Sequence, residues 1–459
     1  MSGRVCGGGD ALSVALSLPV SRLEICHASP YAVARNANAA DAFTVADATD
    51  RTPLLPNGSE HPRSFGERVR AVVSPENGPT WAHSVRFFFL GTWFNVFLVF
   101  VPLSFIAHHL NWDAGLRFLF SFLAILPLAK ACWERRPTNA ELGDTLAGLL
   151  NASFGNAVEI IVGVAALLQG ELRIVQTSML GSILSNLLLV LGCSFLAGGL
   201  KFQESNFQVT AAQTSSSLMT LSVITLVIPA AYHASKANES EPFNGGKLTS
   251  LAPPNPDDRS LSGLLTISRG TAIILLLMYI AYLYFQLKSH ASLFEAEASE
   301  DDESHGPEMN AVSAGVALLA VTVITSFCAD YLVASIEETA ERYSIPKPFI
   351  GLILIPIVAN AAEHVTSIWM AMKNKMELTI GICVGSSIQI ATFVVPLLVI
   401  VGWITGHELT LFFANFETIV LFVSVLLVNL LVQDGKSNYM EGLMLVSLYI
   451  VIALAFWVS

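Results

Sequence analysis

GNAVEIIVG at Gly155–Gly163 and ANAAEHVTS at Ala359–Ser367 are the two stretches that decide the fold of this 459-residue chain. Both contain the pattern Asn-Ala-x-Glu inside an apolar surrounding, and the pattern ends on Glu159 in the first stretch and on Glu363 in the second. The separation of the two glutamates is 363 − 159 = 204 residues. The two stretches therefore look like copies of one another.

A second pair of motifs has the same separation. GSILSN begins at Gly181 and GSSIQI begins at Gly385, and 385 − 181 is again 204. Two motifs that recur at one offset indicate an internal duplication more strongly than either motif alone. The sequence therefore predicts two structurally equivalent halves, each with its own glutamate.

The residues around these motifs are apolar enough to lie in a lipid bilayer. The chain is 53% hydrophobic and 13% charged, whereas about a quarter of the residues of a soluble protein are charged. A helix needs about 20 apolar residues to cross the hydrocarbon core. Eleven segments approach that length, of which the second is short: 86–107, 115–131, 147–168, 177–199, 210–232, 269–287, 311–336, 346–371, 378–404, 411–432 and 440–458.

These segments predict an all-α polytopic membrane protein with eleven transmembrane helices. The helix at 86–107 is an extra one, residues 115–287 form a first five-helix repeat, and residues 311–458 form a second. Because five crossings is an odd number, the second repeat enters the membrane from the opposite side. The result is an inverted repeat, and transporters of this design bind their substrates near the bilayer midplane, where the repeats meet.

The polar parts of the chain indicate its orientation. Residues 1–80 are rich in Ala, Ser, Asn, Gly and Pro, which is typical of a disordered tail. The distribution of Lys and Arg over the short loops places this tail in the cytosol, although Arg342 and Lys347 run against the trend. The polar, proline-rich stretch 233–268 is expected to be a loop on the non-cytosolic side.

An acidic segment at 295–308 separates the two repeats and is expected on the cytosolic side. It holds seven acidic residues and no Lys or Arg. Runs of like charge are usually solvated linkers. The alternative is that the segment gathers divalent cations at the cytosolic mouth through Glu295, Glu297, Glu300, Asp301, Asp302 and Glu303.

Glu159 and Glu363 are the candidate cation-binding and proton-exchanging residues. A charged side chain in the middle of a membrane costs roughly 2.5–3.5 kcal/mol on insertion scales, so acidic residues there are usually functional. The alternative is a neutral carboxylic acid that joins two helices. Oxygen atoms that could complete a site for a hard cation such as Ca²⁺ belong to Asn156, Asn360, Ser182, Ser185, Asn186, Ser386 and Gln389.

This site chemistry predicts exchange. Two carboxylates in a medium of low dielectric constant cannot stay both empty and ionised, so either one divalent cation or protons must neutralise them. A site that alternates between these two states is an antiporter. His364, next to Glu363, is a candidate proton relay or a polar residue at a helix interface. Gly181 and Gly385 either break their helices or allow close helix packing.

At these residues the chain resembles the calcium/proton exchanger family, the vacuolar type of the cation/calcium antiporters. The segments that carry the resemblance are GNAVEIIVG, GSILSNLLLVLG, GLILIPIVANAAEH, GSSIQIA and QDGKSNYMEG. The resemblance implies two central calcium ligands, Glu159 and Glu363, an acidic cytosolic helix that 295–308 resembles, and a vacuolar membrane location. It also implies a luminal entrance at Asp330, and polar groups beside the cation at Asn156, Asn360, Ser182, Ser386 and Gln389.

Other functions are less consistent with the sequence. The nearest alternative is a sodium/calcium exchanger of the same superfamily, which tends to carry an acidic residue where this chain has neutral groups beside the glutamates. The zinc motif H-E-x-x-H and the hydrolase motif G-x-S-x-G are both missing from the sequence. A net charge of −12 argues against nucleic acid as a partner. We expect calcium and protons as substrates and no cofactor, and leave manganese transport and self-association open.

Overall fold

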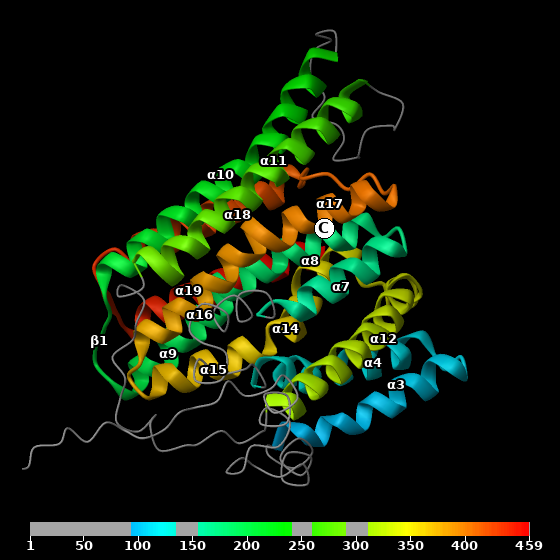
Figure 1. Cartoon of the computed structure of the whole chain (residues 1–459), viewed down its shortest axis with the longest axis horizontal. Helices are drawn as coiled ribbons and strands as arrows, with labels where there is room; N and C mark the ends of the chain where they lie inside the picture. Colours follow the sequence, from blue (N-terminus) through cyan, green and yellow to red (C-terminus); the bar gives the residue numbers. More distant parts are fainter. Residues whose placement is uncertain (1–92, 135–154, 241–258, 291–310, 459) are drawn as a thin grey trace, which may run out of the picture. The chain divides into compact units, whose positions relative to one another are not determined.

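The computed structural model describes residues 93–134, 155–240, 259–290 and 311–458 (Figure 1). Nearly all described residues are helical. Within the described ranges, six helices are long and apolar enough to cross a membrane, or seven if the bent pair Lys347–Ala359 and Ala361–Met372 counts as one span. The helical, multi-pass class predicted from sequence is therefore confirmed. The tail 1–80 and the acidic segment 295–308 lie outside the described residues.

The first described helices pack against the start of the second half. A 3-10 segment, η1 (Trp93–Val99), continues into α3 (Phe100–His109), which is followed by α4 (Ala114–Glu134) and packs on it. The long helix α12 (Ala311–Tyr343) lies along α4. Buried hydroxyl groups help to join α3 to α4, because the Oγ atoms of Ser104 and Ser121 are 2.7 Å apart.

The segments that contain the repeated motifs have matching boundaries. Adding 204 to both ends of α7 gives the ends of α15, and adding 204 to both ends of α9 gives the ends of α17. The π-helical turns η2 and η6 also occupy corresponding positions. The first set is α7 (Ala157–Leu168), α8 (Leu172–Leu184), η2 (Ser185–Val190) and α9 (Leu191–Lys201), and the second is α15 (Ala361–Met372), α16 (Met376–Gln389), η6 (Ile390–Val394) and α17 (Val395–Thr405).

A break in the chain precedes α15. The short elements α13 (Lys347–Phe349), η5 (Ile350–Leu354) and α14 (Ile355–Ala359) form one arm, which meets α15 at an angle of 56°. Asn360 lies at the bend. The amide of Asn360 donates to the carbonyl oxygen of Pro356 at 2.9 Å, and the carbonyl oxygen of Asn360 accepts from the amide of His364 at 3.0 Å. The bend therefore retains hydrogen bonds on both sides.

The remaining helices lie around these two sets. They are α10 (Val209–Ser240), α11 (Arg259–Tyr284) with its π-helical extension η3 (Phe285–Ser289), α18 (Asn415–Leu431) and α19 (Tyr439–Val458). The strand β1 (Ser205–Asn206) pairs antiparallel with β2 (Lys436–Ser437), with Ser205 opposite Ser437.

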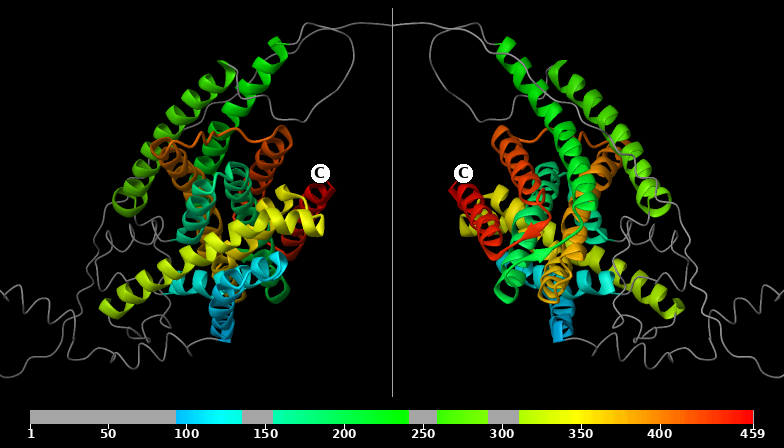
Figure 2. Two further views of the ribbon diagram at one scale, coloured as in Figure 1. Left: turned by 90° about the vertical axis from the view of Figure 1, so that its right-hand side faces the viewer. Right: turned by 90° about the vertical axis from the view of Figure 1, so that its left-hand side faces the viewer.

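The helices α10 and α11 are longer than the sequence analysis expects. The stretch 233–268 is predicted as a loop, but α10 continues to Ser240 and α11 begins at Arg259. With 32 residues, α10 is about 48 Å long, whereas the hydrocarbon core is about 30 Å thick. Figure 2 shows both green helices extending beyond their neighbours. Polar residues can continue a helix once it has left the apolar region, because the backbone hydrogen bonds do not depend on hydropathy.

The α8–α9 segment forms the centre of the helix packing. In the most apolar stretch of this segment 67% is buried, whereas the corresponding share in α19 is 28%. Apolar side chains on α11 and α18 are exposed, for example Leu277 and Ile419. Exposed Leu and Ile in such numbers indicate contact with lipid rather than with water. The outer helices therefore face the bilayer, and α8 with α9 lies shielded from it.

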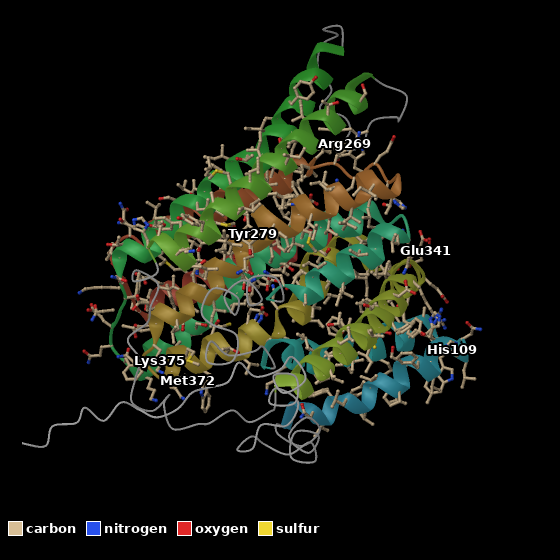
Figure 3. The ribbon with its side chains drawn as sticks, viewed as in Figure 1. His109, Arg269, Tyr279, Glu341, Met372 and Lys375 are labelled. Carbon is tan, nitrogen blue, oxygen red and sulfur yellow. The ribbon has the colours of Figure 1, made fainter. Side chains whose placement is uncertain are left out.

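Two ends of the helices can be distinguished by their side chains. Figure 3 places Met372 and Lys375 at one end and His109 and Glu341 at the other. At the first end, the ammonium group of Lys201 donates to the carbonyl oxygen of Met372 at 2.8 Å, which joins the C-termini of α9 and α15. We call this the lysine end and define it by Lys201, Lys373 and Lys375.

Candidate functional site

Both repeated glutamates stand in the first turn of a helix. Glu159 is the third residue of α7 and Glu363 is the third residue of α15. Each side chain is only 2% exposed, so neither faces lipid. The N-terminus of a helix carries a partial positive charge that stabilises a nearby carboxylate. The position of each glutamate therefore lowers the cost of a negative charge in the membrane.

The asparagine of each motif marks the start of its helix. Asn156 and Asn360 precede α7 and α15 directly and have non-helical backbone angles. They are the residues directly before the first turn of each helix, and Asn360 also lies at the bend between α14 and α15. Both side chains are almost completely buried. An asparagine that directly precedes a helix can extend its side chain to another helix.

Each asparagine bonds to the other half of the protein. Nδ2 of Asn156 donates to Oε1 of Gln389 on α16 at 2.8 Å. Nδ2 of Asn360 donates to the carbonyl oxygen of Ser182 on α8 at 3.2 Å. The starts of α7 and α15 are thus tied to the helix that carries the second motif of the opposite half.

Several polar atoms around these bonds have no partner among the described residues. Oδ1 of Asn156, Oδ1 of Asn360 and both polar side-chain atoms of Asn186 are buried and make no hydrogen bond to any described group. A buried polar atom without a partner costs about 1–3 kcal/mol. Buried oxygen atoms of this kind suit a hard cation that binds through oxygen.

The other predicted ligands are buried near the same helix turns. Ser182 lies on α8 and Ser386 on α16, 204 residues apart, and both are shielded from solvent. Ser185 and Asn186 begin the π-helical turn η2. Such turns widen a helix locally and are frequent at functional sites. The structure thus places the candidate ligands on four segments, α7, α8–η2, α15 and α16.

Known proteins match this chain over most of its length. The family model described as "Sodium/calcium exchanger protein" matches residues 114–288 and 313–458. The vacuolar calcium ion transporter of Schizosaccharomyces pombe is 44% identical over 417 residues, which cover 90% of this chain and 94% of the relative. The vacuolar cation/proton exchanger 2 of Oryza sativa subsp. japonica is 40% identical over 407 residues, covering 86% of this chain and 89% of the relative.

This chain belongs to the calcium/proton exchanger family. Solved structures agree with the assignment. The structure of YfkE, described as a Ca²⁺/H⁺ antiporter protein, shares 33% identity and a TM-score of 0.65, and the match covers 80% of this chain and 99% of YfkE. The H⁺/Ca²⁺ exchanger CAX, at 13% identity and a TM-score of 0.56, has the same fold. The family resemblance found in the sequence is thereby confirmed.

His364 of this exchanger is held by the same break that precedes Glu363. Its Nδ1 donates to the carbonyl oxygen of Asn360 at 2.8 Å. The other ring nitrogen, Nε2, is buried and has no hydrogen bond among the described residues. The ring is therefore fixed through one nitrogen and could exchange a proton through the other.

Asp330 lies far from the glutamates. It is exposed on α12, and its Oδ1 accepts a hydrogen bond of 2.5 Å from Nε2 of Gln169. Gln169 follows the last residue of α7, so it is ten residues from Glu159, or about 15 Å along the helix axis. Asp330 thus contacts the end of α7 opposite to Glu159, and its role at an entrance stays a prediction.

One further carboxylate is buried among the described residues, and it was not predicted from the sequence. Glu417, in the first turn of α18, is 2% exposed and forms an ion pair with Arg173 on α8. Its Oε2 also accepts from the backbone amide of Ala414 at 3.1 Å. The signal in the sequence is weak, because Glu417 has no counterpart in the repeat: position 213 is a glutamine. An ion-paired carboxylate at a helix start has a structural role.

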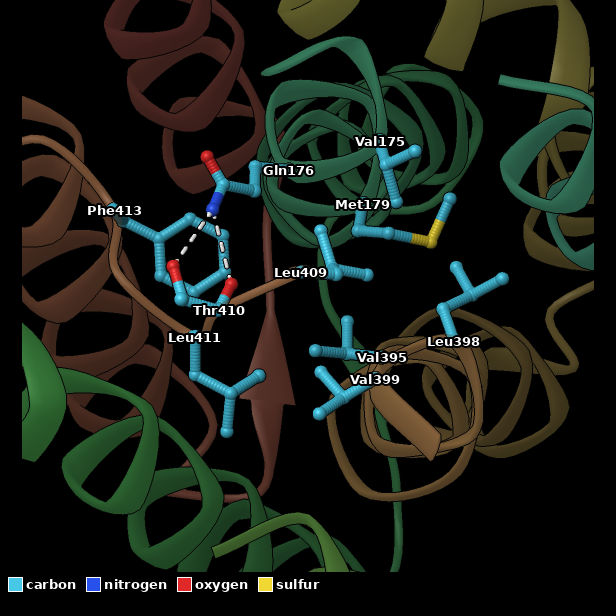
Figure 4. A pocket seen from close by; sticks show the side chains of 10 residues that line it. All are labelled: Val175, Gln176, Met179, Val395, Leu398, Val399, Leu409, Thr410, Leu411 and Phe413. Atoms are coloured by element: carbon cyan, nitrogen blue, oxygen red, sulfur yellow. Dashed lines mark hydrogen bonds between the residues drawn. The ribbon is translucent and has the colours of Figure 1, made fainter. Parts of the chain in front are cut away.

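The exchanger also has a small apolar pocket (Figure 4). It is formed between α8, α17 and the segment before α18. Nε2 of Gln176 bonds to the carbonyl oxygen of Thr410 at 2.9 Å at its edge. None of the candidate cation ligands lines it, and its walls are apolar, so we do not assign the transported ion to it. The lining residues are Val175, Gln176, Met179, Val395, Leu398, Val399, Leu409, Thr410, Leu411 and Phe413.

Proposed function

We propose that this exchanger moves calcium and protons in opposite directions across a membrane, by alternating access to one site built on Glu159 and Glu363. The observation that carries the proposal is that Asn156 and Asn360, each three residues before a buried glutamate, and Asn186 on η2 have buried side-chain oxygen atoms without a hydrogen bond to any described group. The names of the relatives support the same ions, since they are called calcium ion transporters and cation/proton exchangers.

The chemistry of the ligands supports calcium as the cation. Calcium takes about 6–8 oxygen ligands with flexible geometry. Two carboxyl groups, the side-chain oxygens of Asn156 and Asn360, and the hydroxyl groups of Ser182 and Ser386 supply ligands of this type. Manganese accepts the same hard ligands, so we include Mn²⁺ as a second transported ion. Calcium and manganese are substrates here, not cofactors.

The electrostatics supply a reason for exchange. Two ionised carboxylates in a buried site repel each other and lack water, so the empty site is stable only when protons neutralise it. A calcium ion replaces those protons on one side of the membrane, and protons replace the calcium on the acidic side. The unloaded site therefore returns neutral, without a net charge crossing the apolar core.

The architecture that we propose is eleven spans, in which one extra helix precedes two inverted five-helix repeats. The common offset of 204 residues at the ends of α7 and α15 and of α9 and α17 supports equivalent halves. We place the N-terminus in the cytosol, on the side of the lysine end. The vacuolar location stated in the names of the relatives extends to this chain as part of the proposal.

Three further roles belong to this proposal. His364 relays protons to Glu363 through its Nε2 atom, Asp330 attracts cations at the luminal entrance, and the acidic segment 295–308 gathers calcium at the cytosolic side. The relay can be tested with His364→Asn, whose amide can still donate to the carbonyl oxygen of Asn360, and with His364→Leu, which cannot. Equal loss of transport in both variants supports the relay, whereas activity in the asparagine variant alone indicates a packing role.

The experiment that tests the function measures uptake of labelled calcium into proteoliposomes with an acidic interior. Uptake should require the pH gradient, collapse with a protonophore, and be reduced by excess manganese. Glu159→Gln and Glu363→Gln should abolish it. Uptake that persists in either variant would contradict the proposal.

A matched control is Glu417→Gln. Glu417 has the same 2% exposure as Glu159 and Glu363 but pairs with Arg173, so its variant should retain proton-coupled uptake.

The alternative function, sodium/calcium exchange, is suggested by the description of the matching family model. A sodium gradient in place of the pH gradient distinguishes the two, because sodium-driven uptake at uniform pH would favour the alternative.

A further inference from the structure

The last helix of the second half, α19, has one buried stripe. The residues of this stripe recur at intervals of three or four and are Gly442, Leu445, Tyr449, Ile452 and Phe456. Of these five residues only Tyr449 has a polar side-chain atom, and its side chain is 4% exposed. The hydroxyl group of a buried tyrosine usually has a polar partner. The helices beside α19 therefore determine the role of Tyr449.

The backbones of α19 and α9 touch at two places. A Cβ atom at Gly199 of α9 would collide with the amide nitrogen of Tyr439, and one at Gly442 would collide with the carbonyl oxygen of Gly192. The contact thus moves toward the start of α9 as it moves toward the end of α19. The two helices therefore run in opposite directions, and the glycines allow them to approach more closely than side chains would.

Continuing this contact by about two helical turns brings Tyr449 to η2. Tyr449 follows Gly442 by seven residues, and Ser185 precedes Gly192 by seven. The helix α19 contacts η2 directly, and the hydroxyl group of Tyr449 faces that of Ser185. Of the six residues of η2, only Ser185 and Asn186 have polar side chains. The buried phenol group therefore meets the polar start of the π-helical turn.

Ser185 lacks the backbone hydrogen bond that other buried serines of this segment make. The hydroxyl group of Ser178 donates to the carbonyl oxygen of Val175, and that of Ser194 donates to the carbonyl oxygen of Val190. The hydroxyl oxygens of Ser185 and Tyr449 are buried and make no hydrogen bond of regular geometry to a described group. A small rotation of either side chain joins the two as donor and acceptor.

The repeat explains why Ser185 needs a partner of its own. Its equivalent, 204 residues later, is Gln389, which accepts the side-chain hydrogen bond of Asn156. Asn360, the equivalent of Asn156, bonds instead to the backbone carbonyl oxygen of Ser182. A serine side chain is two carbon atoms shorter than a glutamine side chain, so it reaches less far across the contact. The partner that the opposite half offers to Ser185 is the tyrosine of α19.

We propose that Tyr449 is a positioning residue of the cation site, whose hydroxyl group holds Ser185 and the start of η2 in the arrangement that binds calcium. This inference rests on the proposed function. The candidate ligands Ser182 and Asn186 lie three residues before and one residue after Ser185, so a displacement of Ser185 displaces them as well. Loss of the phenol hydroxyl therefore weakens calcium binding and leaves transport at saturating calcium intact.

Tyr449→Phe tests the inference, because it removes the hydroxyl group and keeps the ring. In proteoliposomes with an acidic interior, the calcium concentration at half-maximal uptake should rise about fivefold, which corresponds to about 1 kcal/mol for one hydrogen bond. The maximal rate should be retained. An unchanged calcium dependence, or a loss confined to the maximal rate, would overturn the inference.

A double variant tests whether Tyr449 acts through Ser185. Ser185→Ala combined with Tyr449→Phe should need no more calcium than Ser185→Ala alone, because residues that act through one contact have non-additive effects. Two single effects that multiply in the double variant would show that the residues act independently, which contradicts the inference.

Tyr279→Phe is the matched control. Tyr279 lies on α11, the last helix of the first half, and is also 4% exposed against the equivalent π-helical turn η6. Its ring stacks on that of Phe393 with the ring centroids 5.0 Å apart, and phenylalanine keeps this contact. The control should leave the calcium dependence unchanged, and an equal shift there would overturn the inference. A native protein without proton-driven uptake would instead contradict the proposed function itself.

Discussion

Asn156 donates its side-chain hydrogen bond to Gln389, a residue 233 positions later in the chain, across a distance of 2.8 Å. The donor starts the helix that carries Glu159, and the acceptor ends α16 on the other half of the protein. When one half moves against the other, this hydrogen bond must either break or move Asn156 together with Gln389. The bond therefore couples the position of a proposed calcium ligand to the arrangement of the two halves.

Gln389→Leu should weaken calcium transport by removing this bond. The substitution leaves Nδ2 of Asn156 buried without its acceptor, at a cost of about 1–3 kcal/mol. We expect the calcium concentration for half-maximal uptake to rise about tenfold, since 1.4 kcal/mol corresponds to a factor of ten. Asn429→Leu is the control, because Asn429 bonds to Thr220 away from the site. An unchanged calcium dependence in Gln389→Leu would show that the bond has no part in binding.

Gly181→Ala should destabilise the protein, while Gly385→Ala should not. A Cβ atom at Gly181 would collide with the carbonyl oxygen of Leu352, where α8 crosses η5, but at Gly385 it would meet nothing within 4 Å. Overpacking of this kind costs typically about 1–3 kcal/mol. Thermal unfolding of the purified protein measures both variants. Equal melting temperatures would mean that the crossing of α8 and η5 tolerates a methyl group.

Arg173→Ala should cost more stability than Lys347→Ala. Arg173 is 41% exposed, but its partner Glu417 is 2% exposed and would be left as a buried carboxylate, at about 1–3 kcal/mol. In the pair of Lys347 and Glu337 the side chains are 39% and 62% exposed, and exposed pairs contribute at most about 1 kcal/mol. The melting temperatures of the two variants test this order. A larger effect at Lys347 would contradict it.

Asp113 should make the stability of the protein depend on acid pH. Burial opposes ionisation, but the hydroxyl of Tyr343, the amide of Gly115 and the guanidinium of Arg342 outweigh it and hold the pKa of Asp113 below its ordinary value of 3.8. Ionised Asp113 thus stabilises the folded protein above pH 3.8, and this contribution is lost as the pH falls through the lower folded pKa. Asp113→Asn should lower the melting temperature at neutral pH, and the difference should disappear in strong acid. A difference that does not vary with pH would rule out this origin.

The sequence predicted those features that depend on local pattern. The length of apolar runs indicated the helical membrane class, and the common offset of the Asn-Ala-x-Glu motifs indicated equivalent segments around Glu159 and Glu363. The family was recognisable from the same motifs. These features are encoded in neighbouring residues or in an exact repeat, so no knowledge of tertiary contacts is needed to find them.

Features that depend on distant partners were not predictable. Gly181 and Gly385 occupy the same place in one motif, yet only Gly181 touches another backbone. Glu417 reads as an ordinary helix-start residue until Arg173 is found beside it. Cys383 reads as an apolar residue until Ser367 is found within hydrogen-bonding distance. In each case the partner comes from a different helix, and helix packing decides the role.

Proton release on calcium binding tests the central account most directly. Purified protein in weakly buffered detergent solution is titrated with calcium while a pH indicator records the protons released. The native protein should release protons in proportion to the calcium bound. The double variant, with both Glu159→Gln and Glu363→Gln, should neither bind calcium nor release protons. Calcium binding without any proton release, or normal binding in that double variant, would contradict the account.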